Sequence, residues 1–222
     1  MDDTFCSNKE IDYDYEKHWN NAYLKTPVSN LGWYEEDPIP SMNLIKKCKL
    51  PKNALIFNAG AGATTLIEHL LNEGYSNIVV NDIAVAALTE LKTNLSDYKN
   101  SQLKFIVDDL INPTELLHLK NVDLWHDRAV LHFFTTEEQQ EAYFELLRSA
   151  VRINGFVILA EFELGEATLC SGLTTFNYNE KMLQERLGTD FELLKSFNYR
   201  YRQPAGNTKR YIYTLFQRKV KC

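Results

Sequence analysis

Five short apolar runs recur along the chain, each separated from the next by a stretch with polar residues at helical spacing. Runs of five to seven residues dominated by Val, Ile, Leu and Phe are typical of strands buried on both faces of a sheet. The runs that we predict to be strands span residues 54–58, 77–81, 103–107, 122–126 and 155–161.

The stretches between and around these runs predict helices. Thr135-Thr136-Glu137-Glu138 has the form of a capping box, so a helix is expected to begin there and to reach about Ile153. Ser41 is the expected N-cap of an earlier helix, and Gly74 and Gly188 are stop signals for two others. The predicted helices span residues 42–49, 64–73, 85–95, 135–153 and 180–187, with a short one after Pro113. Alternating strands and helices predict a parallel sheet covered on both faces.

The end of the chain breaks this alternation. Residues 191–200 and 209–218 read as two long aromatic-rich strands around a Pro-Ala-Gly-Asn turn region, with no helix between them. They are therefore expected to pair antiparallel. The predicted fold class is α/β: a doubly wound seven-stranded, mostly parallel sheet with an antiparallel C-terminal hairpin. We divide the chain into an N-terminal cap or lid segment, residues 1–50, and a sheet domain, residues 51–222.

Composition limits the classes of protein to consider. The 222 residues are 45% hydrophobic and carry a net charge of −6, which favours one large domain and argues against general nucleic-acid binding. The sequence has no apolar run of about 18 residues, so a membrane span is not expected. Its N-terminus lacks a basic region followed by an apolar stretch, so a secretory signal is not expected. The four cysteines form no Cys-x-x-Cys pair and the histidines show no ligand spacing, which predicts a cytoplasmic protein without a metal site.

Candidate chemistry gathers where the predicted strands end. Asn58 closes the first strand and leads into a turn containing Gly60 and Gly62, where a backbone without Cβ atoms can approach a ligand closely. Asp82 ends the second strand, twenty residues past Gly62, where a carboxylate can take two ribose hydroxyls. A dinucleotide-dependent oxidoreductase is a weaker reading, because its fingerprint needs a third glycine where this chain has Thr65.

Five ordered segments resemble the class I S-adenosylmethionine-dependent methyltransferases: Asn58-Ala-Gly-Ala-Gly, Val80-Asn-Asp-Ile, Val107-Asp-Asp-Leu, Asp123-Leu-Trp-His-Asp-Arg-Ala-Val-Leu-His-Phe, and the terminal hairpin. The fourth of these segments, together with His18-Trp19-x-x-x-Tyr23 and Gly32-Trp33-Tyr34, looks like a group of small methyltransferase-domain proteins. A more distant similarity is to lysine methyltransferases acting on elongation factor 1A.

The resemblance implies S-adenosyl-L-methionine as cofactor and the region from residue 51 onward as the domain that binds it. The residues that match cofactor-binding positions of the family are Trp19, Tyr23, Asn58, Gly60, Gly62, Asp82, Asp109 and Leu110, with Asp108 as a substitute for Asp109. Asn58 departs from the family, which usually has an acid there to hold the ammonium end of the cofactor's methionine. An amide accepts a hydrogen bond but supplies no charge.

The same resemblance places the acceptor at the end of the fourth strand. His126 and Asp127 match the point where methyl donor and acceptor meet, and either can remove the acceptor's proton. The alternative is structural: a hydrogen-bonded core histidine, and an Asp127 that pairs with Arg128. The predicted acceptor pocket consists of Trp33, Tyr34, His132 and Cys170.

These observations predict a methyltransferase that acts on an unidentified acceptor, with a slight preference for a small molecule. A protein lysine is the close alternative, since Trp33, Tyr34, Trp125 and Phe133 are able to line an aromatic channel. A non-catalytic cofactor-binding or scaffolding protein is a third alternative, suggested by Asn58. The expected partners are the acceptor and no membrane.

Overall fold

The computed structural model describes residues 13–98 and 100–220. The first twelve residues of the predicted cap segment lie outside them. The helices are α1 (Tyr15–Lys25), α2 (Ile39–Lys47), α3 (Leu66–Asn72), α4 (Val85–Asn94), α5 (Glu137–Ala150) and α6 (Glu180–Leu187). Short 3-10 turns span Val28–Asn30, Asn100–Gln102, Leu116–His118 and Leu131–Phe133. The strands are β1 (Ile56–Ala59), β2 (Ile78–Asp82), β3 (Leu103–Val107), β4 (Val122–Arg128), β5 (Val151–Phe162), β6 (Leu169–Cys170), β7 (Leu173–Thr174), β8 (Phe191–Arg202) and β9 (Thr208–Arg218).

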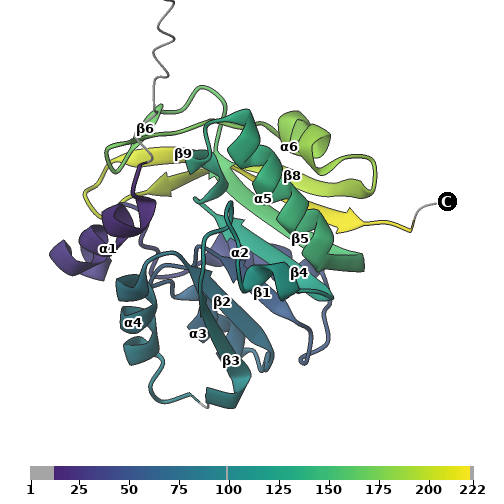
Figure 1. Cartoon of the computed structure of the whole chain (residues 1–222), viewed down its shortest axis with the longest axis horizontal. Coiled ribbons are helices and arrows are strands. Elements are labelled where there is room, and N and C mark those ends of the chain that lie inside the picture. The colour runs from purple at the N-terminus through teal and green to yellow at the C-terminus, as the bar shows by residue number, and fades with distance from the viewer. Residues whose placement is uncertain (1–12, 99, 221–222) are drawn as a thin grey trace, which may run out of the picture.

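Seven strands form one sheet in the order β3-β2-β1-β4-β5-β9-β8 (Figure 1). The first five run parallel, while β9 pairs antiparallel with both β5 and β8. The predicted mostly parallel sheet with an antiparallel C-terminal hairpin is therefore confirmed. The strand order reverses between β1 and β4, which is the place where open α/β sheets bind ligands.

The two faces of the sheet hold separate apolar cores. Ile56 and Leu124 pack with α2, α3 and α4, whereas their neighbours Phe57 and Trp125 pack with α5 and α6. This alternation follows from the period of two along a strand. In Figure 1, α5 lies in front of the sheet, and α1 lies beside α4.

Two predicted helices need correction, and three elements were not predicted. The helix predicted to reach Ile153 ends at Ala150, and β5 begins at once, because Val151 and Ile153 favour extended backbone. The helix expected after Ser41 begins at Ile39, since proline at the first turn suits its missing N–H. Helix α1 and the two-residue strands β6 and β7 were not predicted at all.

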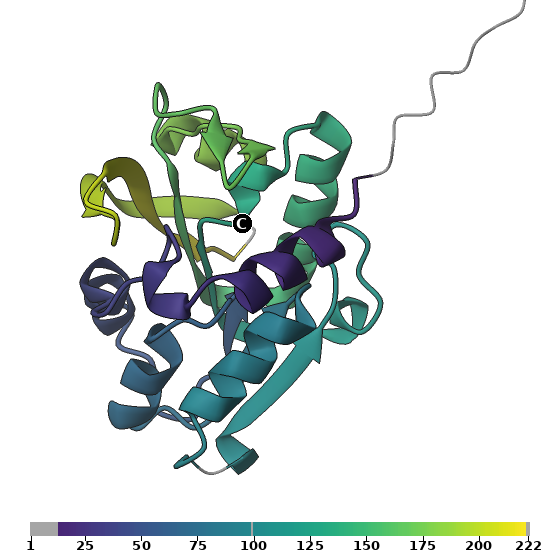
Figure 2. The ribbon, with the colours of Figure 1, turned by 90° about the vertical axis from the view of Figure 1, so that its left-hand side faces the viewer.

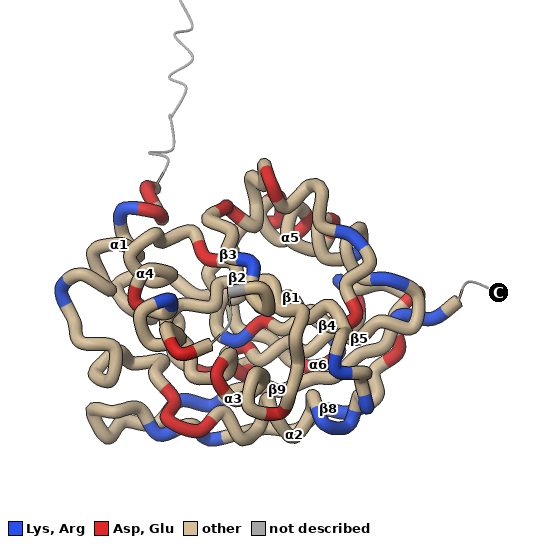
Figure 3. Tube along the Cα trace, turned by 90° about the horizontal axis from the view of Figure 1, so that it is seen from below, with Lys and Arg blue, Asp and Glu red and all other residues tan. Residues whose placement is uncertain are grey.

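Acidic and basic residues are interspersed along the chain trace (Figure 3). No helix within the described ranges is both long and apolar enough to cross a membrane.

Candidate functional site

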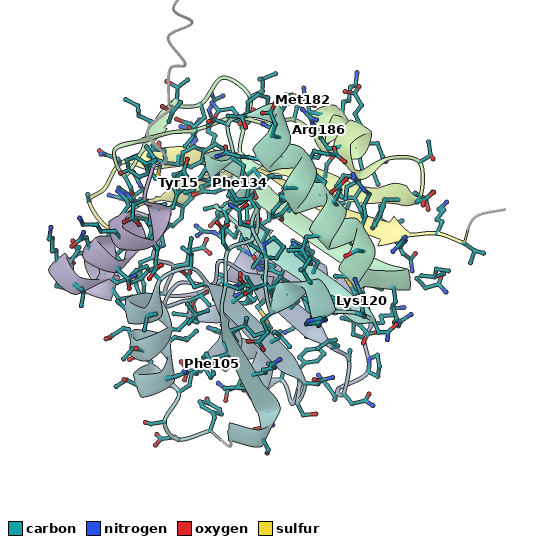
Figure 4. All side chains as sticks on the ribbon, viewed as in Figure 1. Tyr15, Phe105, Lys120, Phe134, Met182 and Arg186 are labelled. Carbon is teal, nitrogen blue, oxygen red and sulfur yellow. The ribbon has the colours of Figure 1, made fainter. Side chains whose placement is uncertain are left out.

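A cavity lies at the carboxyl ends of β1, β2 and β4 and is also lined by residues of α1. Figure 2 shows α1 running across the front of the molecule. The predicted site residues that line the cavity are Trp19, Tyr23, Trp33, Tyr34, Asn58, Gly60, Asp82, Asp109, Leu110, His126, His132 and Cys170. Tyr15 and Phe134, both labelled in Figure 4, line it as well. Asp127 and Gly62 are not among the lining residues.

The glycine turn after β1 depends on two residues without side chains. Gly60 and Gly62 have φ angles of +49° and +59°, a region that residues with a Cβ rarely adopt. A Cβ on Gly60 would lie 2.3 Å from a methyl carbon of Val130, and one on Gly62 would lie 2.1 Å from the hydroxyl oxygen of Tyr23. The turn is therefore closed by close contacts with the cap on one side and the loop after β4 on the other.

Asp82 ends β2 beside this turn and is buried. Its carboxylate accepts hydrogen bonds from the backbone N–H groups of Gly62 (2.7 Å) and Ala84 (2.8 Å). Burial raises the pKa of Asp82 to about 6, and these backbone hydrogen bonds oppose the shift. An ionised carboxylate has about four acceptor positions, so Asp82 keeps capacity to accept from a hydroxyl group of a ligand.

Two neighbouring acids follow β3, and their surroundings separate their roles. The Asp108 carboxylate is occupied by hydrogen bonds within its own loop. It accepts from the backbone N–H groups of Thr114 and Leu116 and from the Thr114 hydroxyl. Asp109 is half-buried, accepts from the N–H of Ile111 (2.9 Å) and borders the cavity with Leu110. Of the two, Asp109 has the carboxylate with more acceptor capacity left for a ligand.

His126 on β4 is buried and held at both ring nitrogens. Nδ1 lies 2.7 Å from Oδ1 of Asn58, and Nε2 lies 2.9 Å from Oγ of Ser41. Burial, and then the nearby charge of Arg128, lower the pKa of His126 to about 3, so the ring is neutral at ordinary pH. Both nitrogens are occupied, which favours the structural alternative for this residue over proton removal from an acceptor.

Asp127 points to the opposite face of β4. Its carboxylate accepts from the hydroxyl of Tyr143 on α5 (2.6 Å), and that hydroxyl accepts from Nε1 of Trp125 (3.0 Å). Burial, reinforced by the neighbouring carboxyl of Glu161, raises the pKa of Asp127 well above its usual value. Trp125 is fully buried in the core, so its predicted place in an acceptor channel is wrong.

Arg128 returns to the face of His126, because side chains two apart on a strand share a side. It pairs with Glu35 (2.9 Å) rather than with Asp127, which corrects the pairing considered from the sequence. Its guanidinium also donates to the carbonyl of Trp33 (2.9 Å) and the hydroxyl of Tyr213 (3.2 Å). This buried pair was not predicted from the sequence. The alternation of side chains along the strand would have shown that Arg128 faces the same side as His126.

His132 lies in the turn after β4, with no exposed surface. Its ring stacks on Phe162 at 4.3 Å, and Nδ1 lies 2.9 Å from Oε2 of Glu161. Burial raises the pKa of Glu161 to about 8. Cys170, at the tip of the β6–β7 hairpin, borders the same part of the cavity.

Aromatic side chains from the N-terminal segment cover the cavity. Trp19 contacts Trp33 and Phe133 edge-on, with ring centroids 5.5 and 4.8 Å apart, and Nε1 of Trp33 donates to the Tyr23 hydroxyl (2.9 Å). The hydroxyl of Tyr201 on β8 donates to the carbonyl of Tyr34. Within the described part of residues 1–50, α1 and the loop before α2 therefore border the cavity, whereas α2 packs on one face of the sheet.

Within residues 13–98 and 100–220, no group of three His, Cys, Asp or Glu side chains has the geometry to hold a metal ion.

Comparisons with known proteins agree with this architecture. EEF1A lysine methyltransferase 2 of Danio rerio is 26% identical over 212 residues, which cover 87% of this chain and 83% of that protein. An S-adenosylmethionine-dependent methyltransferase of Anabaena variabilis matches 92% of this chain and 93% of its own, with a TM-score of 0.71 and 15% identity. A 1,6-didemethyltoxoflavin-N1-methyltransferase of Burkholderia thailandensis, solved with S-adenosylhomocysteine, matches 92% and 84%, with a TM-score of 0.67 and 15% identity. No family model matches the sequence.

Proposed function

We propose that this chain, which is a class I S-adenosylmethionine-dependent methyltransferase, transfers the methyl group to a small molecule held beneath its N-terminal cap. The observation that carries the choice of acceptor is the cover over the cavity: Trp19, Trp33 and Tyr23 join α1 to the loop before α2 by ring contacts and a hydrogen bond. A cavity roofed by aromatic side chains suits a compact acceptor.

The residues around the glycine turn fit the cofactor. Gly60 and Gly62 form a turn in which Cβ atoms would collide with neighbouring groups, and Asp82 beside it is the proposed acceptor for the ribose hydroxyls. Asp109 at the next strand end is the proposed partner of the adenine amino group, with Leu110 packing beside the ring. Trp19 and Tyr23 would cover the bound cofactor from α1.

S-Adenosylmethionine supplies an electrophilic methyl group on a sulfonium sulfur. The chain's own task is to align the acceptor with that methyl group and to exclude water, and holding two reactants in line lowers the barrier by several kcal/mol. Phe133, Phe162 and Cys170 shape the proposed acceptor end, with Trp33 and Tyr34 above it. We do not assign proton removal to His126 or Asp127, whose polar atoms are committed to Asn58, Ser41 and Tyr143.

A protein lysine is the second candidate acceptor. The similarity to EEF1A lysine methyltransferase 2 over 87% of the chain favours it. Lysine transfer needs a neutral amine in an aromatic channel. Trp19, Trp33 and Phe133 are among the aromatic residues that line the cavity and would form such a channel.

The cytoplasmic location predicted from cysteine usage stays a prediction.

The test uses S-adenosylmethionine labelled in the methyl group, a host-cell extract divided at about 5 kDa, and purified elongation factor 1A as a separate acceptor. We expect label in the small-molecule fraction with the wild-type protein and none with Asp82→Ala. Label only on lysines of the large fraction or of elongation factor 1A would replace the first candidate by the second. Absence of labelled product in every arm, despite cofactor binding, would contradict both.

A further inference from the structure

Asn58, His126 and Ser41 form a hydrogen-bonded row along the wall of the cofactor cavity. Asn58 and His126 are paired in register on β1 and β4, and Ser41 reaches the ring from α2. His126 is 3% exposed and Asn58 is also 3% exposed, yet both border the cavity. Nδ2 of Asn58 makes none of the hydrogen bonds found among the described residues, so one end of the amide is held and the other is available to a ligand.

A neutral imidazole carries one N–H and one bare nitrogen. In one arrangement Nδ1–H donates to Oδ1 of Asn58, and the NH₂ end of the amide faces the cavity. In the other, Nε2–H donates to Ser41, Nδ1 accepts from Nδ2 of Asn58, and the carbonyl oxygen faces the cavity. The two arrangements differ by a half-turn of the amide and occupy the same heavy-atom positions.

Ser41 can serve the second arrangement. A serine hydroxyl carries two acceptor lone pairs beside its one O–H, so the Ser41 oxygen, 2.9 Å from Nε2 of His126, is able to accept from Nε2–H. Arg128, on the same face of β4, adds a positive charge that disfavours a second proton on the ring. The row is therefore built around a histidine that stays neutral.

The chemistry of the ligand selects between the arrangements. The ammonium group of a bound amino acid has three donors and no acceptor, so it is repelled by an amide NH₂ and attracted by a carbonyl oxygen. We infer that neutral His126, donating to Ser41, turns the carbonyl oxygen of Asn58 toward the cavity to accept a hydrogen bond from the cofactor's α-ammonium. His126 is then a positioning residue: it orients the Asn58 amide so that its oxygen accepts from the ammonium group, at a position where the family usually has an acid. This inference rests on the proposed function.

Calorimetric titration tests it with two ligands: S-adenosylhomocysteine and its des-amino analogue, which lacks only the ammonium group. The wild-type protein is expected to bind S-adenosylhomocysteine at least tenfold more tightly, as a hydrogen bond to a charged group predicts. Asn58→Leu should abolish this preference, whereas Asn58→Asp should keep it, because a carboxylate also accepts from the ammonium. Ser41→Ala should reduce the preference several-fold, since His126 loses the acceptor that fixes its tautomer.

Ser149→Ala is the matched control, because Ser149 lies on α5 and its hydroxyl, among the described residues, hydrogen-bonds with the Leu146 carbonyl and with Lys120. It should leave both affinities unchanged. A nitrogen NMR spectrum of the complex provides the second readout: we expect a protonated Nε2 and a bare Nδ1 on His126. Equal affinity of the wild-type protein for both ligands, or the opposite tautomer in the complex, would overturn the inference while leaving the proposed function intact. Failure to bind S-adenosylhomocysteine at all would overturn both.

Discussion

At the residue scale, alternation along β4 decides which side chains can reach a ligand. His126 and Arg128 face α2 and the cap, while Trp125 and Asp127 face α5. The sequence predicted that His126 and Asp127 lie at a strand end, but not that they lie on opposite faces there. The period of two that would have separated them was visible in the sequence, whereas Glu35, the partner of Arg128, is brought close only by the tertiary fold.

Asp82→Ala should weaken binding of S-adenosylhomocysteine more than about tenfold, or about 1.4 kcal/mol, because the ribose loses its acceptor. Titration calorimetry measures the change. Glu138→Gln, an exposed change on α5, is the control and should bind like the wild-type protein. Unchanged affinity in a folded Asp82→Ala variant would remove Asp82 from the site.

The raised pKa of Asp82 predicts a pH dependence of the same affinity. Below about pH 6 the carboxyl takes up a proton and loses acceptor capacity, so affinity should fall as the pH drops through that value. The measurement is a titration series between pH 5 and pH 8 with S-adenosylhomocysteine. Asp82→Asn should bind weakly at every pH and show a flatter profile; a profile as steep as that of the wild-type protein would assign the titration to another group.

At the element scale, long periodic segments were predictable and the N-terminal segment was not. Helix α6 and strand β3 have the predicted bounds because local pattern and packing agree. Helix α1 lacks a buried stripe, and it packs through contacts such as the bond from the Ala86 N–H to Asn20, 66 residues away. Its local signals were Asp14 as N-cap, accepting from the N–H of Lys17, with Glu16 in the first turn and Lys25 in the last.

Helix α5 begins with a capping box, but one residue later than the sequence predicted: Thr136 and Gln139 form it in place of Thr135 and Glu138. Thr136 accepts from the N–H of Gln139, whose side chain reaches back to the N–H of Thr136. Thr136→Ala should lower the free energy of unfolding by about 1 kcal/mol without changing cofactor affinity, since a lost N-cap typically costs that much. Chemical denaturation measures it, with the neighbouring Thr135→Ala as control. Equal losses in both variants would show that the cap contributes nothing specific.

At the scale of the whole molecule, one buried ion pair joins the cap to the sheet. Arg128 on β4 binds Glu35 and the carbonyl of Trp33, and its guanidinium lies 4.9 and 5.0 Å from the ring centroids of Tyr201 and Tyr211. The segment before α2 is thus attached to β4 and to the terminal hairpin together. We therefore predict that loss of the Arg128–Glu35 pair loosens the segment over the cavity.

Glu35→Gln should detach that segment, because it leaves the buried charge of Arg128 without an anion, a loss of about 3 kcal/mol. We expect faster hydrogen exchange of residues 28–38 and weaker binding of S-adenosylhomocysteine. The adjacent, exposed Glu36→Gln is the matched control and should exchange like the wild-type protein. Exchange rates in residues 28–38 that match between the two variants would show that the pair does not hold the cap.

The cofactor is the central claim, and calorimetric titration of the wild-type protein with S-adenosylhomocysteine, S-adenosylmethionine and NAD tests it most directly. The site around Gly60, Gly62 and Asp82 predicts binding of the first two ligands in the micromolar range and none of NAD. Binding of NAD instead, or no binding of either adenosyl compound by the folded protein, would contradict the account.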